Sequence, residues 1–285
     1  DNVSPENPVL LSRVDGHSVL VNSYLIRESG ITADTPDPPG GEIVRDPVTG
    51  DPTGIFKETA KDLLEYDRDK EGYLAKDEPS EEMEGWLAAL NKAARLGVTS
   101  IQHPGDGNFD IYRRLMDMGE LTLRVDVSFE LTDDPDTLAM YDNLRSEYPR
   151  EGGWIRFGIL KDFMDGTLGS ATAMFFEPYE DDSINTGLAQ MKYSEMEKRV
   201  IAADSMGFQI GIHAIGSKAN HWILNAYEMA EKVNGARDSR HRSEHAQILI
   251  DQDIPRFAEL GVVASMQPTH CITDMHFCEK RIGRK

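Results

Sequence analysis

From residue 80 to residue 285 the chain alternates between helical and strand-like patterns, and this alternation restricts the fold more than any other feature. The segment "EEMEGWLAALNKAARLG" has apolar residues at helical spacing and stops at Gly97, and the β-branched run "VTSIQH" follows it. The same order recurs as far as "VVASMQPTH", giving six strand candidates. Strands separated by helical stretches of this length predict parallel βαβ units.

A parallel sheet with crossover helices is either doubly wound or closed into a barrel. No G-x-G-x-x-G pattern follows the early strand candidates, so the dinucleotide-binding version lacks its fingerprint. We therefore expect an α/β fold of the (β/α)8 TIM-barrel type. Because six strand candidates are fewer than the eight strands of such a barrel, two strands must be missing or misread.

The first part of the chain, residues 1–79, has a different character. Its segment "TADTPDPPGGEIVRDPVTGDPTG" is rich in proline and glycine, a composition that a plain helix or strand cannot carry. We expect residues 1–79 to form an inserted, loop-rich subdomain that lies as a lid over the strand ends, with one helix in "KETAKDLLEY". Residues 80–285 then form the barrel section.

Charge and cysteine content narrow the range of partners. The 285 residues include 50 acidic and 30 basic side chains, and the formal net charge of -20 opposes binding to nucleic acid. No apolar run approaches the roughly 20 residues of a membrane span, so we expect no membrane association. Cys271 and Cys278 are too few for a disulfide scaffold and have no usual zinc spacing, which favours a reducing, cytoplasmic location. The expected partner is a small-molecule substrate.

Polar side chains follow the strand candidates at the point where each one ends. Catalytic residues of parallel barrels stand at the carboxyl ends of the strands. The six residues at these positions are His103, Glu130, Lys161, His213, His245 and His270. Four histidines in six positions predict a metal site, and His213 and His245 are the strongest candidate ligands because each directly follows a strand-like run.

Lys161 lies near the end of the strand-like run "FGILKDF", where a lone buried charge is costly. The residues alone favour an ion pair with Asp162 or Asp165. The alternative is a lysine whose pKa is lowered by burial, since a neutral amine can react with carbon dioxide to give a carbamate, an anionic oxygen ligand able to bridge two metals.

Several long motifs resemble one known family. They are "RVDGHSVLVNS", "KDFMDGTLGSATA", "EPYEDDSINTGL", "HAIGSKAN", "HRSEHAQ" and "DIPRFAELGVVASMQPTH", and together they resemble the amidohydrolase superfamily. The branch they resemble includes N-substituted formamide deformylases and many metal-dependent hydrolases. The resemblance covers nearly the whole chain.

This resemblance implies a (β/α)8 barrel with one or two divalent metal ions, zinc above all, and a metal-activated water that attacks an amide-like C–N bond. Lys161 would be the fourth-strand lysine that bridges the metals when carboxylated, and His213 and His245 the fifth- and sixth-strand ligands. The family's first-strand H-x-H pair would precede Asp1 and its eighth-strand aspartate would follow Lys285. We therefore expect an internal section with strands two to seven, whose metal site is incomplete.

Three further residues are predicted to contact the substrate. His17 in "RVDGH" belongs to the inserted segment, and its alternative role is that of a turn residue. Asp165 orients Lys161 or binds substrate, unless it caps the turn at Gly166. His270 closes the last strand candidate, where no metal role is expected.

Two rival functions remain. In "HRSEH", His241, Glu244 and His245 match the H-x-x-E-H motif of zinc peptidases, which requires a helix, whereas the local pattern predicts a strand. The non-enzymatic alternative is an inactive remnant or an oligomerising scaffold whose sheet edges pair between subunits, giving a homo-oligomer.

Overall fold

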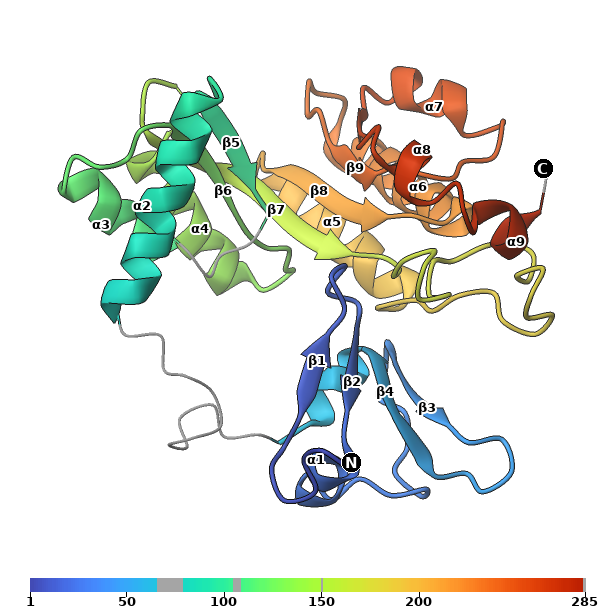
Figure 1. Ribbon diagram of the computed structural model, residues 1–285. Coiled ribbons are helices and arrows are strands. Elements are labelled where there is room, and N and C mark those ends of the chain that lie inside the picture. Colours follow the sequence, from blue (N-terminus) through green and yellow to red (C-terminus); the bar gives the residue numbers. More distant parts are fainter. Residues whose placement is uncertain (66–78, 105–108, 150, 284–285) are drawn as a thin grey trace.

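The computed structural model describes residues 1–65, 79–104, 109–149 and 151–283, with the backbone alone for residues 79–82. The described chain forms two parts, an antiparallel sheet at the N-terminus and a larger α/β part with a parallel sheet (Figure 1). None of the helices in these ranges combines the length and apolarity that crossing a membrane requires.

The parallel sheet contains six strands in the order β10-β9-β8-β7-β6-β5. Every neighbouring pair of strands is parallel. The strands also follow one another across the sheet in the order of the chain. The strands are β5 (Ser100–His103), β6 (Arg124–Glu130), β7 (Ile155–Phe163), β8 (Gln209–Ala214), β9 (Arg242–His245) and β10 (Val263–Ser265). Each lies within one of the six predicted strand runs, which confirms a mixed α/β fold with parallel βαβ units.

The parallel sheet is strongly curled. Arg242 of β9 donates from Nη1 to Oε1 of Gln102 of β5 at 2.6 Å, although three strands lie between them in the sheet. In a flat sheet strands four places apart are separated by about 19 Å. The side chains therefore meet across the concave face, and the six strands form a half-barrel whose edges are β5 and β10.

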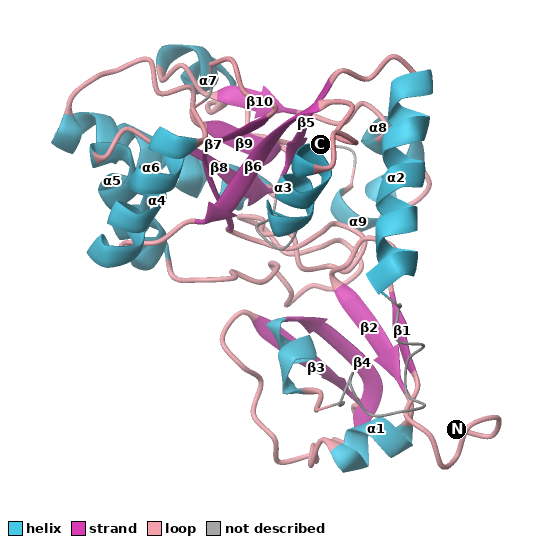
Figure 2. Cartoon of the chain, turned by 90° about the vertical axis from the view of Figure 1, so that its left-hand side faces the viewer, coloured by secondary structure: helices cyan, strands magenta, loops and turns pink. Residues whose placement is uncertain are grey.

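Most of the helices connect successive strands and cover the curled sheet on its outer side, whereas the two short helices at the end of the chain follow the last strand (Figure 2). A large core of buried side chains, including Phe157, Phe208 and Ile212, fills the space between the sheet and the helices of the middle of the chain. Asp134 caps one of these helices, accepting from the backbone N–H of Thr137 at 2.8 Å. The helices are α2 (Pro79–Arg95), α3 (Phe109–Asp117), α4 (Pro135–Glu147), α5 (Tyr193–Ser205), α6 (Ser217–Asn234), α7 (Ile254–Glu259), α8 (His270–Thr273) and α9 (Cys278–Ile282).

The N-terminal part is more regular than its composition predicts. It is a four-stranded antiparallel sheet of order β1-β2-β4-β3 with its own small core around Leu25, Ile43 and Phe56. Its elements are β1 (Leu10–Ser12), β2 (Ser18–Val21), α1 (Ser23–Glu28), β3 (Gly41–Arg45), β4 (Pro52–Glu58) and the 3-10 helix η1 (Thr59–Leu63).

Residues 10–58, which were expected to be loop-rich, hold these four strands between their turns. The helix expected in "KETAKDLLEY" is reduced to the 3-10 turn η1, because Lys57 and Glu58 still belong to β4. Residues 66–78, which include the end of that run and approach the expected boundary at residue 79, lie outside the described residues.

Candidate active site at the strand ends

The carboxyl ends of β7, β8 and β9 bring together the residues singled out in the sequence. Phe163 of β7 is in register with His213 of β8, and Ala214 of β8 with His245 of β9. The rings of His213 and His245 lie edge to face with centroids 4.6 Å apart. Neighbouring parallel strands thus place the two imidazoles side by side, with Lys161 one pleat earlier on β7.

Lys161 is buried, with 9% of its surface exposed. Its Nζ donates to the carbonyl oxygen of Asp162 at 2.7 Å and lies 3.5 Å from the ring centroid of Phe163. Burial lowers the pKa of Lys161 to about 8, although Glu244 and Asp162 act in the opposite direction. The amine is therefore poised to be neutral within the ordinary pH range.

The ion pair favoured by the sequence does not form among the described residues. The Asp162 carboxylate accepts from the backbone N–H of Phe163 at 2.8 Å and pairs with Nη1 of Arg199 at 3.0 Å. Asp165 is occupied by backbone groups instead. Lys161 thus keeps a backbone carbonyl as its hydrogen-bond partner, with no carboxylate within ion-pair distance in the part of the chain that the structure covers.

His213 is almost fully buried, and its Nε2 lies 2.9 Å from the carbonyl oxygen of Gly166. A carbonyl oxygen only accepts, so Nε2 carries the proton and Nδ1 keeps its lone pair. Burial lowers the pKa of His213 well below its ordinary value, and His245 and Lys161 add to that shift. His213 is therefore a neutral imidazole whose Nδ1 has a free lone pair that could bind a metal ion.

His245 ends β9 with a strained backbone, since its φ of 77° lies in the left-handed region. Its Nδ1 lies 2.7 Å from Oε1 of Gln267, which leaves Nε2 with the lone pair. Burial lowers the pKa of His245, opposed by the Gln267 hydrogen bond. Strain of this kind is concentrated at functional sites, where surrounding contacts hold a side chain in place.

His270 does not end a strand, and that part of its prediction is wrong. Strand β10 stops at Ser265, and His270 is the first residue of α8. Its ring nevertheless stacks on the ring of His245, with centroids 5.8 Å apart and an interplanar angle of 27°. His270 thus stands beside the candidate site, reached from a helix.

His17 comes to the same place from the antiparallel sheet. It lies in the turn between β1 and β2, and Figure 1 shows this hairpin pointing at the end of β7. The ring centroid of His17 is 5.1 Å from that of His213. Its Nδ1 lies 2.8 Å from Oε2 of Glu58, a buried carboxylate at the end of β4 that sequence reasoning missed.

Asp165 is fully buried beneath the site. Its two oxygens accept from three backbone N–H groups, those of Met174 at 2.8 Å, Ile215 at 2.9 Å and Gly216 at 2.8 Å. Burial raises the pKa of Asp165 to about 7, while these three donors act to lower it. This geometry ties the segment after β7 to the start of α6, and it gives no support to a substrate contact.

The two remaining strand-end residues do not join the site. Nδ1 of His103 lies 2.8 Å from the hydroxyl of Tyr112, which is buried against α2 and β5. Glu130 is exposed and lies 3.8 Å from Arg199. Both residues thus contribute to packing and surface charge.

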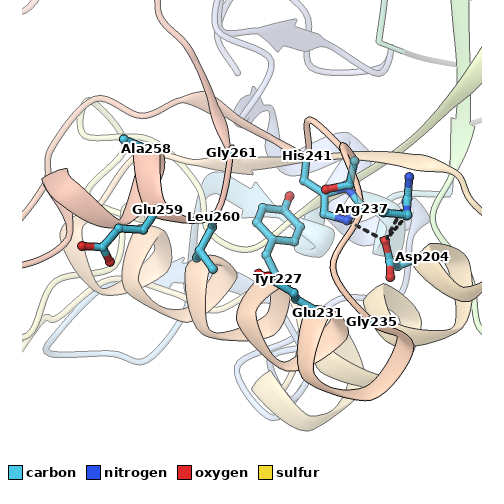
Figure 3. A pocket seen from close by; sticks show the side chains of 11 residues that line it. Asp204, Tyr227, Glu231, Gly235, Arg237, His241, Ala258, Glu259, Leu260 and Gly261 are labelled. Atoms are coloured by element: carbon cyan, nitrogen blue, oxygen red, sulfur yellow. Dashed lines mark hydrogen bonds and ion pairs between the residues drawn. The ribbon is translucent and has the colours of Figure 1, made fainter.

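The zinc-peptidase interpretation of "HRSEH" is wrong, because the motif forms strand β9. His241 directly precedes this strand and His245 is its last residue, so the two lie about 13 Å apart at the rise of an extended chain. His241 faces a cavity of about 270 Å³ at the opposite end of the sheet, where its Nε2 lies 3.0 Å from Oδ1 of Asp204 (Figure 3). Glu244 pairs with Arg242 at 2.5 Å.

The donor set is compatible with a divalent metal ion only if Lys161 takes part. Within the described residues no three side chains from among His, Cys, Asp and Glu converge closely enough to hold an ion. His213 and His245 supply two neutral imidazoles, each with one nitrogen fixed by a protein oxygen. This is how metal-binding histidines are usually oriented. A carboxylated Lys161 would add the oxygen ligand.

Comparison with known proteins gives a consistent picture. The model of the amidohydrolase family matches residues 1–285. Protein LONG AFTER FAR-RED 3 of Arabidopsis thaliana is 35% identical over 99% of this chain and 49% of its own length. An N-substituted formamide deformylase of Arthrobacter pascens is 28% identical over 92% of this chain and 48% of its own length.

A similar structure has also been solved. An uncharacterized metal-dependent hydrolase of Pyrococcus furiosus has a TM-score of 0.65 and 26% identity over 98% of this chain and 54% of the solved chain. The chain thus spans about half the length of these relatives. Because the family match runs from the first residue to the last, the chain belongs to the amidohydrolase family.

Proposed function

We propose that the protein is a metal-dependent hydrolase that cleaves an amide-like C–N bond in a small molecule. The observation that carries this proposal is the meeting of His213, His245 and the buried Lys161 at adjacent strand ends. Family membership and the solved metal-dependent hydrolase support it. The curled parallel sheet supports a complete (β/α)8 barrel in the whole enzyme.

Three side chains would hold the metal. His213 would bind through Nδ1 and His245 through Nε2, because the other nitrogen of each ring already lies against a protein oxygen. A bound divalent ion, with zinc the one we propose, supplies a Lewis acid that polarises a carbonyl and lowers the pKa of water. The neutral imidazoles are suited to this role because they need not release a proton to bind it.

Lys161 would become an oxygen ligand by carboxylation. Its neutral Nζ attacks the carbon of carbon dioxide, an N–C bond forms, and one amine proton is lost to solvent. The lowered pKa of Lys161, about 8, provides the neutral amine that this step requires. The carbamate carries two oxygens and a negative charge, which replaces the repulsion of an ammonium group by attraction for a cation.

The test combines metal content with turnover. We expect the protein to contain a divalent metal by elemental analysis and to hydrolyse members of a panel of N-formyl and N-acyl amines, with loss of turnover after chelation. His213→Gln and Lys161→Met should lower both metal content and turnover at least about tenfold. His221→Gln is the matched control, because His221 belongs to helix α6 and pairs with Asp253, which precedes α7. Full metal content in His213→Gln would contradict the proposed ligand set.

A further inference from the structure

Glu58 and His17 form a pair that the ligand set does not include. Both side chains are largely buried, with 15% of His17 and 5% of Glu58 exposed. Oε2 of Glu58 lies 2.8 Å from Nδ1 of His17, and the backbone N–H of Glu58 donates to the carbonyl oxygen of His17 at 3.0 Å. Side chain and backbone of one residue thus hold the same histidine.

Glu58 is also fixed on its other side. Its Oε1 accepts from the hydroxyl of Thr172 at 2.7 Å, and Thr172 belongs to the segment that follows β7. The backbone of Glu58 has a φ of 51°, a left-handed conformation that a non-glycine residue adopts only when its surroundings enforce it. Glu58 is therefore placed by contacts from both parts of the molecule, with one oxygen for each part.

This arrangement fixes which nitrogen of His17 keeps its lone pair. A carboxylate can only accept a hydrogen bond, so Nδ1 of His17 carries the proton that is donated to Glu58. In the neutral ring Nε2 then keeps its lone pair and can only accept a hydrogen bond. The ring lies against His213, with centroids 5.1 Å apart. A small molecule bound at His213 and His245 would therefore have a hydrogen-bond acceptor within reach on the side of the antiparallel sheet.

We infer that His17 accepts a hydrogen bond from an N–H group of the substrate through Nε2, and that Glu58 is the positioning residue that holds the ring for this contact. The inference rests on the proposed function and narrows its substrate class to amides whose nitrogen carries hydrogen. A site built to bind an N–H group discriminates strongly against the analogue that lacks it, because the acceptor is then left unpaired.

The test compares an N-monosubstituted amide with its N-methyl analogue, which has no N–H group. The wild-type protein should prefer the N–H amide in kcat/KM by at least about tenfold. His17→Phe keeps a ring against His213 but has no acceptor, and its preference should fall to within about twofold to threefold. Glu58→Leu should lose the preference to the same extent, and the double variant should be no worse than His17→Phe alone.

Two variants separate positioning from general damage. Glu58→Gln keeps an oxygen that accepts from Nδ1 of His17, so it should retain the preference. Thr172→Val removes the other hydrogen bond of Glu58 without touching His17, and it too should retain the preference. Circular dichroism and metal content should match the wild type in all variants. Equal turnover of the two amides by the wild type, or an undiminished preference in His17→Phe, would overturn the inference.

One measurement is independent of turnover. In long-range proton–nitrogen spectra of histidine-labelled protein, His17 should show the Nδ1-protonated tautomer in the wild type and Glu58→Gln, and lose it in Glu58→Leu. If the wild type hydrolyses neither amide, the proposed function fails while this spectrum still decides whether Glu58 holds the tautomer. A wild-type His17 protonated at Nε2 alone would refute the positioning role.

Discussion

Replacing Asp204 by alanine should destabilise the protein without disturbing the proposed metal site. Asp204 lies near the end of α5, just before the start of β8, whereas His213 lies near the carboxyl end of that strand. Its Oδ1 accepts from Nε2 of His241 at 3.0 Å and from Nε of Arg237 at 2.9 Å, and its Oδ2 from Asn234 at 2.9 Å. The carboxylate thus anchors the loop that leads into β9.

The magnitude follows from what Asp204→Ala leaves behind. The side chain of His241 is 4% exposed, so its Nε2–H would stay buried without an acceptor, at about 1–3 kcal/mol. The side chain of Arg237 is 32% exposed and recovers water, so the loss of its pair costs at most about 1 kcal/mol. We expect a loss of about 3 kcal/mol in the free energy of unfolding.

Urea unfolding measures this loss, and Asp238→Ala provides the matched control. Asp238 pairs with Arg240, but the two side chains are 73% and 69% exposed, so its removal should leave the free energy of unfolding nearly unchanged. At a temperature where both variants are folded, metal content and turnover should equal those of the wild type. Equal stability of the two variants would refute the energetic argument, and a folded Asp204→Ala without metal would place the site at the wrong end of the sheet.

Three further predictions concern buried ionisable groups. Asp165→Asn replaces one acceptor oxygen by a donor that faces a backbone N–H, so it should lower the free energy of unfolding by about 2 kcal/mol. Hydrogen exchange at the Ile215 and Gly216 amides should become faster, and unchanged exchange would contradict the anchoring role. In the metal-free protein burial lowers the pKa of Lys161 from 10.5 to about 8, so the unfolded state keeps this proton to a higher pH than the folded state does. The free energy of unfolding should therefore rise by about 3 kcal/mol between these two pH values, and Lys161→Met should lack this rise. Burial raises the pKa of Asp204, but hydrogen bonds from His241 and its neighbours hold it at about 2, below the ordinary value of 3.8. The stabilisation by Asp204 is therefore present above pH 3.8 and is lost as the pH falls toward 2. Acid unfolding of the wild type and of Asp204→Ala should show this difference.

Local periodicity predicted the parallel sheet because the pattern of each helix and each strand is visible within its own segment of the sequence. The helical spacing and glycine stop before "VTSIQH" correspond to α2 and β5, and the same holds for the later units. The antiparallel sheet escaped prediction because its strands lie between turns rich in proline and glycine, without the regular alternation of helix and strand seen after residue 80. Buried positions such as Val19, Val21 and Phe56 alternate with exposed ones too briefly, between turns of proline and glycine, to stand out.

The candidate site was predictable where it depended on position along a strand. His213 and His245 follow strand runs, and parallel pairing alone brings their rings together. His270 was misplaced because Pro268 and its neighbours turn the chain into α8 after β10 has ended. Glu58 could not be found, since its role depends on a left-handed backbone and on Thr172, 114 residues away along the chain.

That separation bears on how the site is assembled. The antiparallel sheet closes within residues 10–58, and the strands of the half-barrel pair with their neighbours in chain order. The contact between His17 and His213, like that between Glu58 and Thr172, joins two such units across a long stretch of the chain. Contacts of this kind form late in folding, because closing a long loop costs entropy before the contact compensates for it. During refolding, helical and sheet signals should therefore return before the contact between His17 and His213 does, and a partly folded chain would lack the assembled site of the proposed hydrolysis.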